Sequence, residues 1–220
     1  MLKSDVFNRF ARVMVENKYG KINLYQKQNL FFIQRHKGNT PPHKINYLAY
    51  IQALADMGVK KILSVNSVGS LKKKIKPGSL LVPDDFISVW NTPTFFDKEI
   101  KHITPNFCED LRTVLYKTVR QLGFRVYDGG IYLQTPGPRL ETPAEIKMFS
   151  KFADVVGMTL GSEVTLANEK NINFAAICMI DNYANGLVGT MDYDKIKEGA
   201  AKNLSKIEKI LRIFLRKYES

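Results

Sequence analysis

Short apolar runs alternate along the chain with longer segments whose apolar residues recur at helical spacing. The apolar runs, which have the length of buried strands, are Asn29–Ile33, Lys61–Val65, Ser79–Val82, Gly130–Gln134 and Phe174–Ile180. Helical spacing is found in Ile45–Met57, Leu111–Leu122, Thr142–Phe149 and Leu204–Leu215. Alternating strands and helices predict a three-layer α/β/α fold, in which helices cover both faces of a mixed, mostly parallel central sheet.

The chain has the size and composition of an ordinary soluble domain. Its 220 residues are 45% hydrophobic and 25% charged, which predicts a single domain over residues 1–220. No apolar run approaches the roughly 20 residues that span a bilayer. Met1–Asp5 lacks the apolar segment of a signal peptide, so we expect a cytoplasmic protein with no membrane partner. Cys108 and Cys178 are expected to be free buried thiols rather than a disulfide or a metal site.

The net charge of +12 raises the question of nucleic acid as a partner. The lysines are scattered, and the one run, at residues 72–76, has no aromatic residues among its lysines. We therefore expect solvated surface lysines that mildly attract anionic substrates, and a nucleic-acid partner is unsupported.

Two segments fall outside the alternation. Met1–Lys18 has the spacing of a short amphipathic helix, with Val6, Phe7, Phe10, Val13 and Met14 on its apolar face. Pro83–Asn106 contains aromatic residues and prolines without a clear period, which predicts a long ordered loop. This loop is expected to act either as a surface lid or as a subunit contact.

Polar residues follow two of the predicted strands in patterns that suit an anion. Arg35 and His36 come directly after the first strand, where a guanidinium fork and an imidazole can hold phosphate. Asn66 and Ser67 follow the next strand, and backbone amides at such a turn can form an anion-binding nest. The alternatives are a surface ion pair for the first group and a turn without a ligand for the second.

The most informative pattern lies between residues 157 and 184. Gly157–Thr159 is a tight glycine turn that presents a hydroxyl, and the strand Phe174–Ile180 delivers Asn182 just past its carboxyl end. In open α/β sheets ligands collect at that edge, so the pattern indicates a small molecule with both an anionic group and a flat polar ring. Glu141 and Glu163 stand beside helix starts, where each has the alternative role of offsetting the helix dipole.

Ten motifs in register resemble one known family. They are Arg35–His36, Pro42–Tyr47, Ser67–Leu71, Pro77–Gly78, Asp84–Ile87, Thr94–Phe96, Gly137–Arg139, Glu141–Thr142, Gly157–Thr159 and Glu163–Val164. Together they resemble the trimeric purine nucleoside phosphorylase and methylthioadenosine phosphorylase family, from about residue 19 to the C-terminus. The resemblance implies a phosphorylase/hydrolase-like fold and the cleavage of a purine nucleoside by inorganic phosphate. It implies no cofactor besides this co-substrate, and a homotrimer or a dimer of trimers.

The resemblance also assigns roles to individual residues. The phosphate would be held by Arg35, His36, Asn66, Ser67 and Thr159, with catalytic roles for His36, Glu141 and Asn182. The nucleoside would contact Leu140, Glu141, Met158, Asn182 and Ala184, and His102 would reach across a subunit interface toward the neighbour's 5′ substituent. Catalysis would rest on positioning and on hydrogen bonds to the charge that builds on the leaving purine.

The choice of purine can be argued from three positions. Asn182 stands where methylthioadenosine phosphorylases have an aspartate, and Ala184 replaces their second aspartate. An asparagine can donate to a 6-oxopurine where an aspartate can only accept, and Glu141 matches the glutamate that accepts from N1–H in 6-oxopurine enzymes. Both features favour hypoxanthine or guanine as the base, with or without a 5′-methylthio group on the sugar.

The chain departs from the family in two segments. The family opens with a strand and a glycine-rich phosphate loop that have no counterpart in Met1–Lys18, and Lys37–Thr40 is two residues shorter and lacks a second histidine. Two alternatives therefore stand beside the 6-oxopurine phosphorylase: a methylthioadenosine phosphorylase, and a non-catalytic homologue that keeps the purine pocket.

Overall fold

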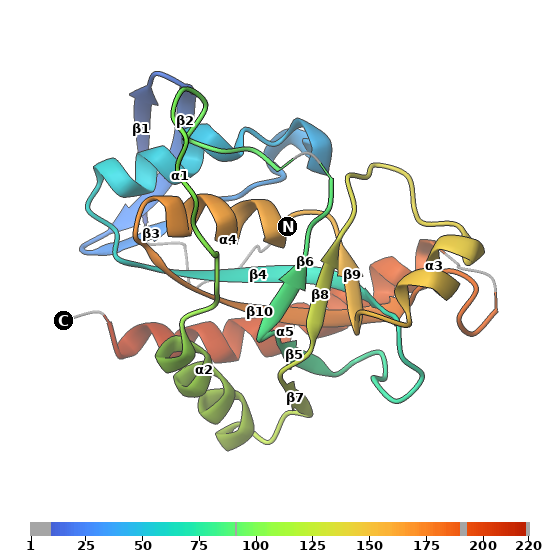
Figure 1. The fold of residues 1–220 in the computed structure, drawn as a ribbon. Coiled ribbons are helices and arrows are strands. Elements are labelled where there is room, and N and C mark those ends of the chain that lie inside the picture. Colours follow the sequence, from blue (N-terminus) through green and yellow to red (C-terminus); the bar gives the residue numbers. More distant parts are fainter. Residues whose placement is uncertain (1–9, 91, 190–192, 219–220) are drawn as a thin grey trace.

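The computed structural model describes residues 10–90, 92–189 and 193–218, which form two sheets and five α-helices (Figure 1). The larger sheet has seven strands in the order β6-β8-β9-β4-β10-β5-β7. In that order the strands are Asp85–Ile87, Ile131–Gln134, Val155–Gly157, Lys61–Ser70, Asn173–Tyr183, Leu80–Val82 and Val126–Asp128. Neighbouring strands run parallel except at β4–β9 and β10–β5, so the sheet is mixed, as predicted.

Helices cover both faces of this sheet, which confirms the three-layer α/β/α prediction (Figure 1). On one face lie α1 (Tyr47–Asp56) and α4 (Leu160–Glu169), and on the other lie α2 (Glu109–Gln121) and α5 (Tyr193–Arg216). The central strand β10 is buried on both sides because its residues alternate between two apolar clusters. Phe174, Ala176, Cys178 and Ile180 pack in the cluster of α1 and α4, whereas Ala175, Ile177 and Met179 pack in the cluster of α2 and α5.

The five strands and four helices expected from the alternating pattern are present, with shifted ends. The strand predicted at Lys61–Val65 continues to Ser70, and the one at Phe174–Ile180 continues to Tyr183. The capped helix is α3 (Pro143–Phe149), and the C-terminal helix begins earlier than predicted, at Tyr193. Both strand extensions run through the polar residues that follow the apolar runs, so they carry the candidate site residues on the sheet itself.

The expected helix at Met1–Lys18 is wrong over Ala11–Asn17, which form β1. This strand pairs antiparallel with β2 (Gly20–Lys27), and β3 (Leu30–Phe32) completes a small sheet beside the main one. The β-branched residues Val13 and Val15 are half-buried and alternate with exposed neighbours, so the period is two and Met14 is 66% exposed. The remainder of that expected helix, at residues 1–9, lies outside the described residues.

The segment Pro83–Asn106 is a loop for most of its length, as predicted, although its beginning forms the short strand β6. The loop is fastened to the last turn of α4. The Glu169 carboxylate accepts hydrogen bonds from Thr94 Oγ1 at 2.7 Å and from the Phe95 amide at 2.6 Å. The loop therefore crosses one face of the molecule in a defined position.

Cys108 and Cys178 are both free thiols, in agreement with the sequence. Cys178 is fully buried in the core as expected, whereas Cys108, at the start of α2, is only half-buried. Burial raises the pKa of the Cys178 thiol, so it remains protonated. In the part of the chain that the structure covers, no helix is long and apolar enough to cross a membrane.

The start of α3 offers a test of local stability close to the candidate site. Thr142 Oγ1 accepts from the Glu145 amide at 3.2 Å, and the Glu145 carboxylate accepts from the Thr142 amide at 2.7 Å. Thr142→Ala removes one of these bonds and should lower the free energy of unfolding by about 1 kcal/mol, measured by urea denaturation. Thr113→Ala, inside α2, is the control and should change stability by no more than about 0.5 kcal/mol. Equal losses in both variants would contradict the capping role.

Candidate active site

A buried ion pair between Arg35 and Glu163 lies at the centre of the candidate site. Arg35 follows β3, and Glu163 lies in the first turn of α4. Arg35 Nη1 and Glu163 Oε2 are 2.6 Å apart, and the two side chains are only 15% and 4% exposed. Burial is the largest single influence and alone would lower the pKa of Arg35. The charge and hydrogen bond of Glu163, together with Tyr50 and Tyr47, outweigh burial and raise this pKa above its ordinary value.

Glu163 accepts further hydrogen bonds that satisfy its carboxylate. Ser64 Oγ, on β4, donates to Oε2 at 2.6 Å, and the Tyr50 hydroxyl, on α1, donates to Oε1. Burial and the adjacent negative charge of Glu163 raise the pKa of Tyr50, which keeps its hydroxyl protonated as a donor. Glu163 therefore links α1, β4 and α4 instead of merely offsetting a helix dipole.

Two further residues that the sequence singles out join this network. Arg35 Nη1 lies 3.1 Å from Asn66 Oδ1 and 3.3 Å from Thr159 Oγ1. The Thr159 hydroxyl in turn donates to Asn66 Oδ1 at 3.0 Å. Three of the five expected phosphate residues thus meet, although they come from the end of β3, from β4 and from the start of α4.

The turn before α4 is shaped by Tyr132, on β8. The Tyr132 hydroxyl accepts from the amides of Thr159 and Leu160, at 3.2 and 3.4 Å, and so caps the helix start. The Thr159 side chain makes no capping bond, which leaves its hydroxyl to the polar cluster. Residue 157 must be glycine because a Cβ there would overlap the Tyr132 hydroxyl.

Ser67 is held by a different partner from the other expected phosphate residues. Its hydroxyl donates to Asp181 Oδ2, and Asn203 Nδ2, on α5, donates to Asp181 Oδ1 at 2.8 Å. Burial raises the pKa of Asp181, while the hydrogen bonds from Ser67 and Asn203 oppose this rise. Ser67 therefore lies at the same end of β4 as Asn66 but faces the neighbouring strand β10.

The residues expected around the purine lie where the end of β10 meets the loop before α3. Glu141 is buried, and its Oε1 accepts from Thr135 Oγ1 at 2.6 Å. Asn185 Nδ2 donates to the Glu141 carbonyl at 3.1 Å, which ties this loop to the end of β10. Ala184 is buried, and the Asn182 amide nitrogen Nδ2 donates to the Tyr183 carbonyl at 2.7 Å.

Met158 lies between these two groups of polar residues. A Cβ at Gly137 would overlap its sulfur, so the loop before α3 packs directly on the Gly157–Thr159 turn. The Thr135 amide donates to the Gly157 carbonyl at 2.9 Å, which fixes the same contact through the backbone. Leu140, which the sequence places against the base, is 44% exposed.

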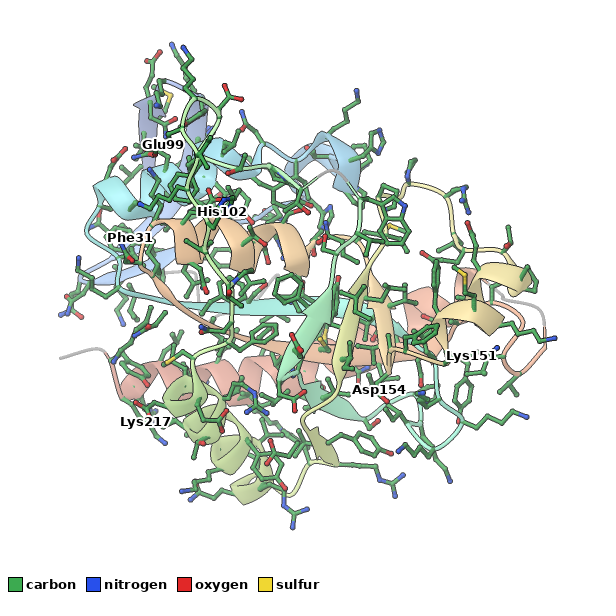
Figure 2. All side chains as sticks on the ribbon, in the orientation of Figure 1. Phe31, Glu99, His102, Lys151, Asp154 and Lys217 are labelled. Carbon is green, nitrogen blue, oxygen red and sulfur yellow. The ribbon has the colours of Figure 1, made fainter. Side chains whose placement is uncertain are left out.

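The structure does not bring the two expected histidines into the polar cluster. His36 is exposed, and its Nδ1 lies 2.8 Å from the Thr40 carbonyl, within a turn that contains the 3₁₀ helix Lys37–Asn39. His102 is also exposed and lies on the long loop (Figure 2). Among the described residues, no hydrogen bond or ion pair joins His102 to the polar cluster.

Sequence reasoning missed the buried partners of the site residues. Tyr50 looks like one more apolar residue in the helical stripe of α1, and Ser64 lies inside an apolar run. The one available signal was that both carry a hydroxyl at positions predicted to be buried, where each needs a hydrogen-bond partner. Tyr132, inside the apolar run Gly130–Gln134, was missed for the same reason.

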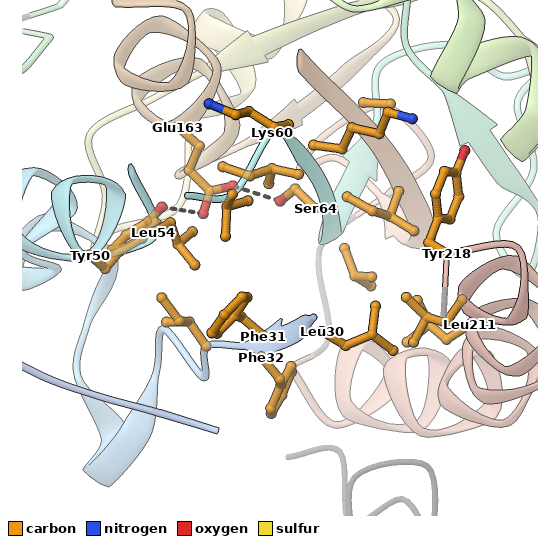
Figure 3. Close-up of a pocket in the computed structure, with 18 of the residues that line it drawn as sticks. Leu30, Phe31, Phe32, Tyr50, Leu54, Lys60, Ser64, Glu163, Leu211 and Tyr218 are labelled. Carbon is orange, nitrogen blue, oxygen red and sulfur yellow. Dashed lines mark hydrogen bonds between the residues drawn. The ribbon is translucent and has the colours of Figure 1, made fainter. Parts of the chain in front are cut away.

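A cavity of about 730 Å³ opens on the other side of the Arg35–Glu163 ion pair (Figure 3). Among the site residues expected from the sequence, only Arg35 and His36 line it, so it is distinct from the place where Thr159, Glu141 and Asn182 lie. Within the described ranges, no group of three or more histidine, cysteine, aspartate or glutamate side chains could hold a metal ion.

Comparisons with known proteins agree with this geometry. Residues 14–216 match the model of the phosphorylase superfamily. The chain is 38% identical to a probable 6-oxopurine nucleoside phosphorylase of Archaeoglobus fulgidus, over 99% of this chain and 93% of that protein. It is 42% identical to a probable S-methyl-5′-thioinosine phosphorylase of Methanocaldococcus jannaschii, over 89% of this chain and 82% of that protein.

Among solved structures, a mutant adenosine/methylthioadenosine phosphorylase of Schistosoma mansoni, in complex with methylthioadenosine, has a similar fold. Its TM-score is 0.86 at 24% identity, over 99% of this chain and 88% of that chain. This likeness supports the fold alone, whereas the family follows from the match over most of the sequence and from the two relatives above. The chain belongs to the phosphorylase superfamily.

Proposed function

We propose that this protein is a purine nucleoside phosphorylase that cleaves a 6-oxopurine nucleoside with inorganic phosphate, giving the free base and a pentose 1-phosphate. The observation that carries the proposal is a pair of polar groups beside the Gly157–Thr159 turn. The first contains Arg35, Asn66 and Thr159, which are within hydrogen-bonding distance of one another. The second contains Glu141, which contacts this turn through Thr135 and is tied by Asn185 to the end of β10, the strand that carries Asn182. No cofactor is required in this reaction besides phosphate as the co-substrate.

The first group suits the attacking phosphate. Arg35, Asn66 and Thr159 place a guanidinium, an amide and a hydroxyl within hydrogen-bonding distance of one another. Such a set can orient phosphate toward the anomeric carbon while the glycosidic bond breaks, and Met158 offers an apolar surface to the cationic sugar. Ser67 and His36 would have to turn away from Asp181 and Thr40 to contribute.

The second group suits a 6-oxopurine base. A 6-oxopurine presents an N1–H donor, an O6 acceptor and a developing negative charge at N7 as it leaves. The buried Glu141 carboxylate can accept from N1–H, and the Asn182 amide can donate to O6 or N7. Ala184 places no acidic group beside the ring, in keeping with a base that lacks a 6-amino group.

The proposal includes a homotrimer, alone or as a dimer of trimers, in the cytoplasm. The long loop exposes Val89 and Ile100, at 75% and 93%, and Trp90 is partly exposed. So much apolar surface on a fixed loop suits a subunit contact. In such an assembly His102, which lies on this loop, would extend the neighbour's site toward the 5′ position of the sugar.

Two other functions remain as alternatives. A relative named for S-methyl-5′-thioinosine keeps a 5′-methylthio group in consideration, and the solved structure above belongs to an enzyme named for adenosine and methylthioadenosine. A non-catalytic purine-binding homologue is favoured by one observation. The Arg35 guanidinium is already engaged by Glu163, and His36 faces Thr40.

The function is tested by incubating the protein with inosine, with and without phosphate, and following hypoxanthine release. We expect release that requires phosphate, because phosphate is the nucleophile. Adenosine and methylthioadenosine should react more slowly, because Asn182 and Glu141 complement a 6-oxo group. Preference for adenosine or methylthioadenosine would place the protein with the 6-aminopurine enzymes, and preference for methylthioadenosine would make it a methylthioadenosine phosphorylase. Binding of hypoxanthine without turnover of any of these nucleosides would support the non-catalytic homologue.

The base-selecting residues are tested by Asn182→Asp. The aspartate cannot donate while ionised, so inosine cleavage should slow by about two orders of magnitude, corresponding to about 3 kcal/mol of lost transition-state stabilisation. Cleavage of adenosine should improve in the same variant. Glu141→Gln should also slow inosine cleavage, since it replaces an acceptor by an amide. Asn173→Asp, exposed at the opposite end of β10, is the matched control and should leave both rates unchanged.

The assembly is tested by light scattering at micromolar protein concentration. We expect a mass of three or six times the 25.1 kDa chain, because the apolar residues of the long loop would be covered between subunits. Ile100→Asp places a charge on that surface and should lower the mass, whereas Met14→Asp, exposed on β1, should not. A monomeric parent protein would rule out the homotrimer.

A further inference from the structure

Glu141 is a buried acid whose two carboxylate oxygens have different surroundings. The residue is only 6% exposed. Its Oε1 accepts a hydrogen bond from Thr135 Oγ1 at 2.6 Å, whereas no hydrogen bond from a described residue reaches Oε2. Among the described side chains, every oxygen that is closed to solvent has a hydrogen-bond partner, so Oε2 is open to solvent. The small exposed part of Glu141 therefore includes the one oxygen that a ligand can use.

The Thr135 hydroxyl directs its proton to Glu141. A threonine hydroxyl has a single proton to donate. The other acceptor beside it, the Gly157 carbonyl, lies 3.4 Å from Oγ1, compared with 2.6 Å for Glu141 Oε1. A short hydrogen bond to a carboxylate is also stronger than one to a neutral carbonyl. The bond to Glu141 is therefore the one that this hydroxyl makes.

Thr135 is held by the sheet rather than by the loop that carries Glu141. It follows β8 directly, and its amide donates to the Gly157 carbonyl at 2.9 Å, which continues the pairing of β8 with β9. The preceding residue, Gln134, is fastened to α4. Its Nε2 donates to Ser162 Oγ at 2.7 Å, and its Oε1 accepts from the Ser162 amide at 2.9 Å. The buried Thr135 hydroxyl is thus a fixed point from which the Glu141 carboxylate is oriented.

The backbone of Glu141 is restrained as well. Asn185 Nδ2 donates to the Glu141 carbonyl at 3.1 Å, and the next residue, Thr142, is the N-cap of α3. The freedom that remains to Glu141 lies in its side-chain torsions, and the hydrogen bond from Thr135 restricts these. Without that bond the carboxylate could rotate, and Oε2 would no longer have a single direction.

We propose that Thr135 is a positioning residue for base selectivity, which holds Glu141 so that Oε2 accepts from N1–H of a 6-oxopurine. The proposal rests on the proposed function, because it takes Glu141 to be the residue that accepts from the base. A fixed acceptor bonds to N1–H of hypoxanthine, whereas it faces a lone pair on the unprotonated N1 of a 6-aminopurine. Thr135 acts through Glu141 and does not itself touch the base.

The role is tested by Thr135→Val, which keeps the shape of the side chain and removes its hydroxyl. We expect kcat/KM for inosine to fall about tenfold, a typical effect of losing one hydrogen bond to a charged group. The value for adenosine should stay the same or rise, because a released Glu141 can turn away from N1. The ratio of the two values should therefore fall about tenfold or more. Thr135→Ser retains the hydroxyl and should keep most of the selectivity.

Thr118→Val, on α2, is the matched control. Thr118 is also buried, and its hydroxyl donates to the Val114 carbonyl at 2.8 Å, so this variant loses a comparable hydrogen bond away from the candidate site. Its ratio of inosine to adenosine cleavage should equal that of the parent protein. Equal losses with both nucleosides in Thr135→Val would overturn the proposal, as would a Thr135→Ser variant that behaves like Thr135→Val.

Binding of free bases separates this role from the proposed function, because it needs no turnover. In calorimetry, hypoxanthine should bind the parent protein more tightly than unsubstituted purine, which has no N1–H, and Thr135→Val should remove most of this preference. Such a preference without inosine cleavage would support the role of Thr135 and count against the proposed function. Inosine cleavage with the same preference in parent and Thr135→Val would overturn the role of Thr135 alone.

Discussion

The arrangement of the site depends on the buried ion pair between Arg35 and Glu163. Burying these two charges costs desolvation free energy, and further hydrogen bonds to both groups help to compensate this cost. The Glu163 carboxylate accepts hydrogen bonds from Ser64 and Tyr50, and the Arg35 guanidinium donates to the Val65 carbonyl. Removing either charge alone would leave the other buried, at a typical cost of about 3–5 kcal/mol. The ion pair therefore fixes α1, α4 and the end of β3 against β4.

The same interaction limits how the site can bind an anion. A phosphate beside Thr159 would compete with Glu163 for one guanidinium, and two anions close to one cation repel each other. Glu163 is also held by Tyr50, whose raised pKa keeps its proton in place. The hydroxyls of Tyr50 and Ser64 would therefore still donate to the Glu163 carboxylate if Arg35 also contacted an anion. If Arg35 binds phosphate as proposed, the groups that satisfy Glu163 and the Val65 carbonyl will influence that affinity together with the direct contacts to phosphate.

The sequence predicts most of the fold because burial imposes periodicity. Strand β10 and the helices pack on apolar neighbours at regular spacing. Strand β1 is the exception: its apolar residues also fit a helical face, but in the structure Val13 and Val15 are half-buried while Met14 between them is exposed. Asn66 and Thr159 could be placed together because each lies near a strand end at one edge of the sheet. The hydrogen bonds of Ser67 with Asp181 and of Tyr50 with Glu163 could not be predicted, because they depend on how elements far apart in the sequence approach each other.

The two groups of candidate site residues are in contact at the turn before α4. Gly157 packs against the Tyr132 hydroxyl, and Gly137 packs against the Met158 side chain. A Cβ at either glycine would therefore displace its neighbour. Tyr132 caps α4, which releases the Thr159 hydroxyl for Asn66. The loop that carries Glu141 and the turn that presents Thr159 therefore pack directly on each other, through the Met158 side chain and through the Thr135 amide, which donates to the Gly157 carbonyl. This contact fixes the position of Glu141 relative to the cluster of Arg35, Asn66 and Thr159.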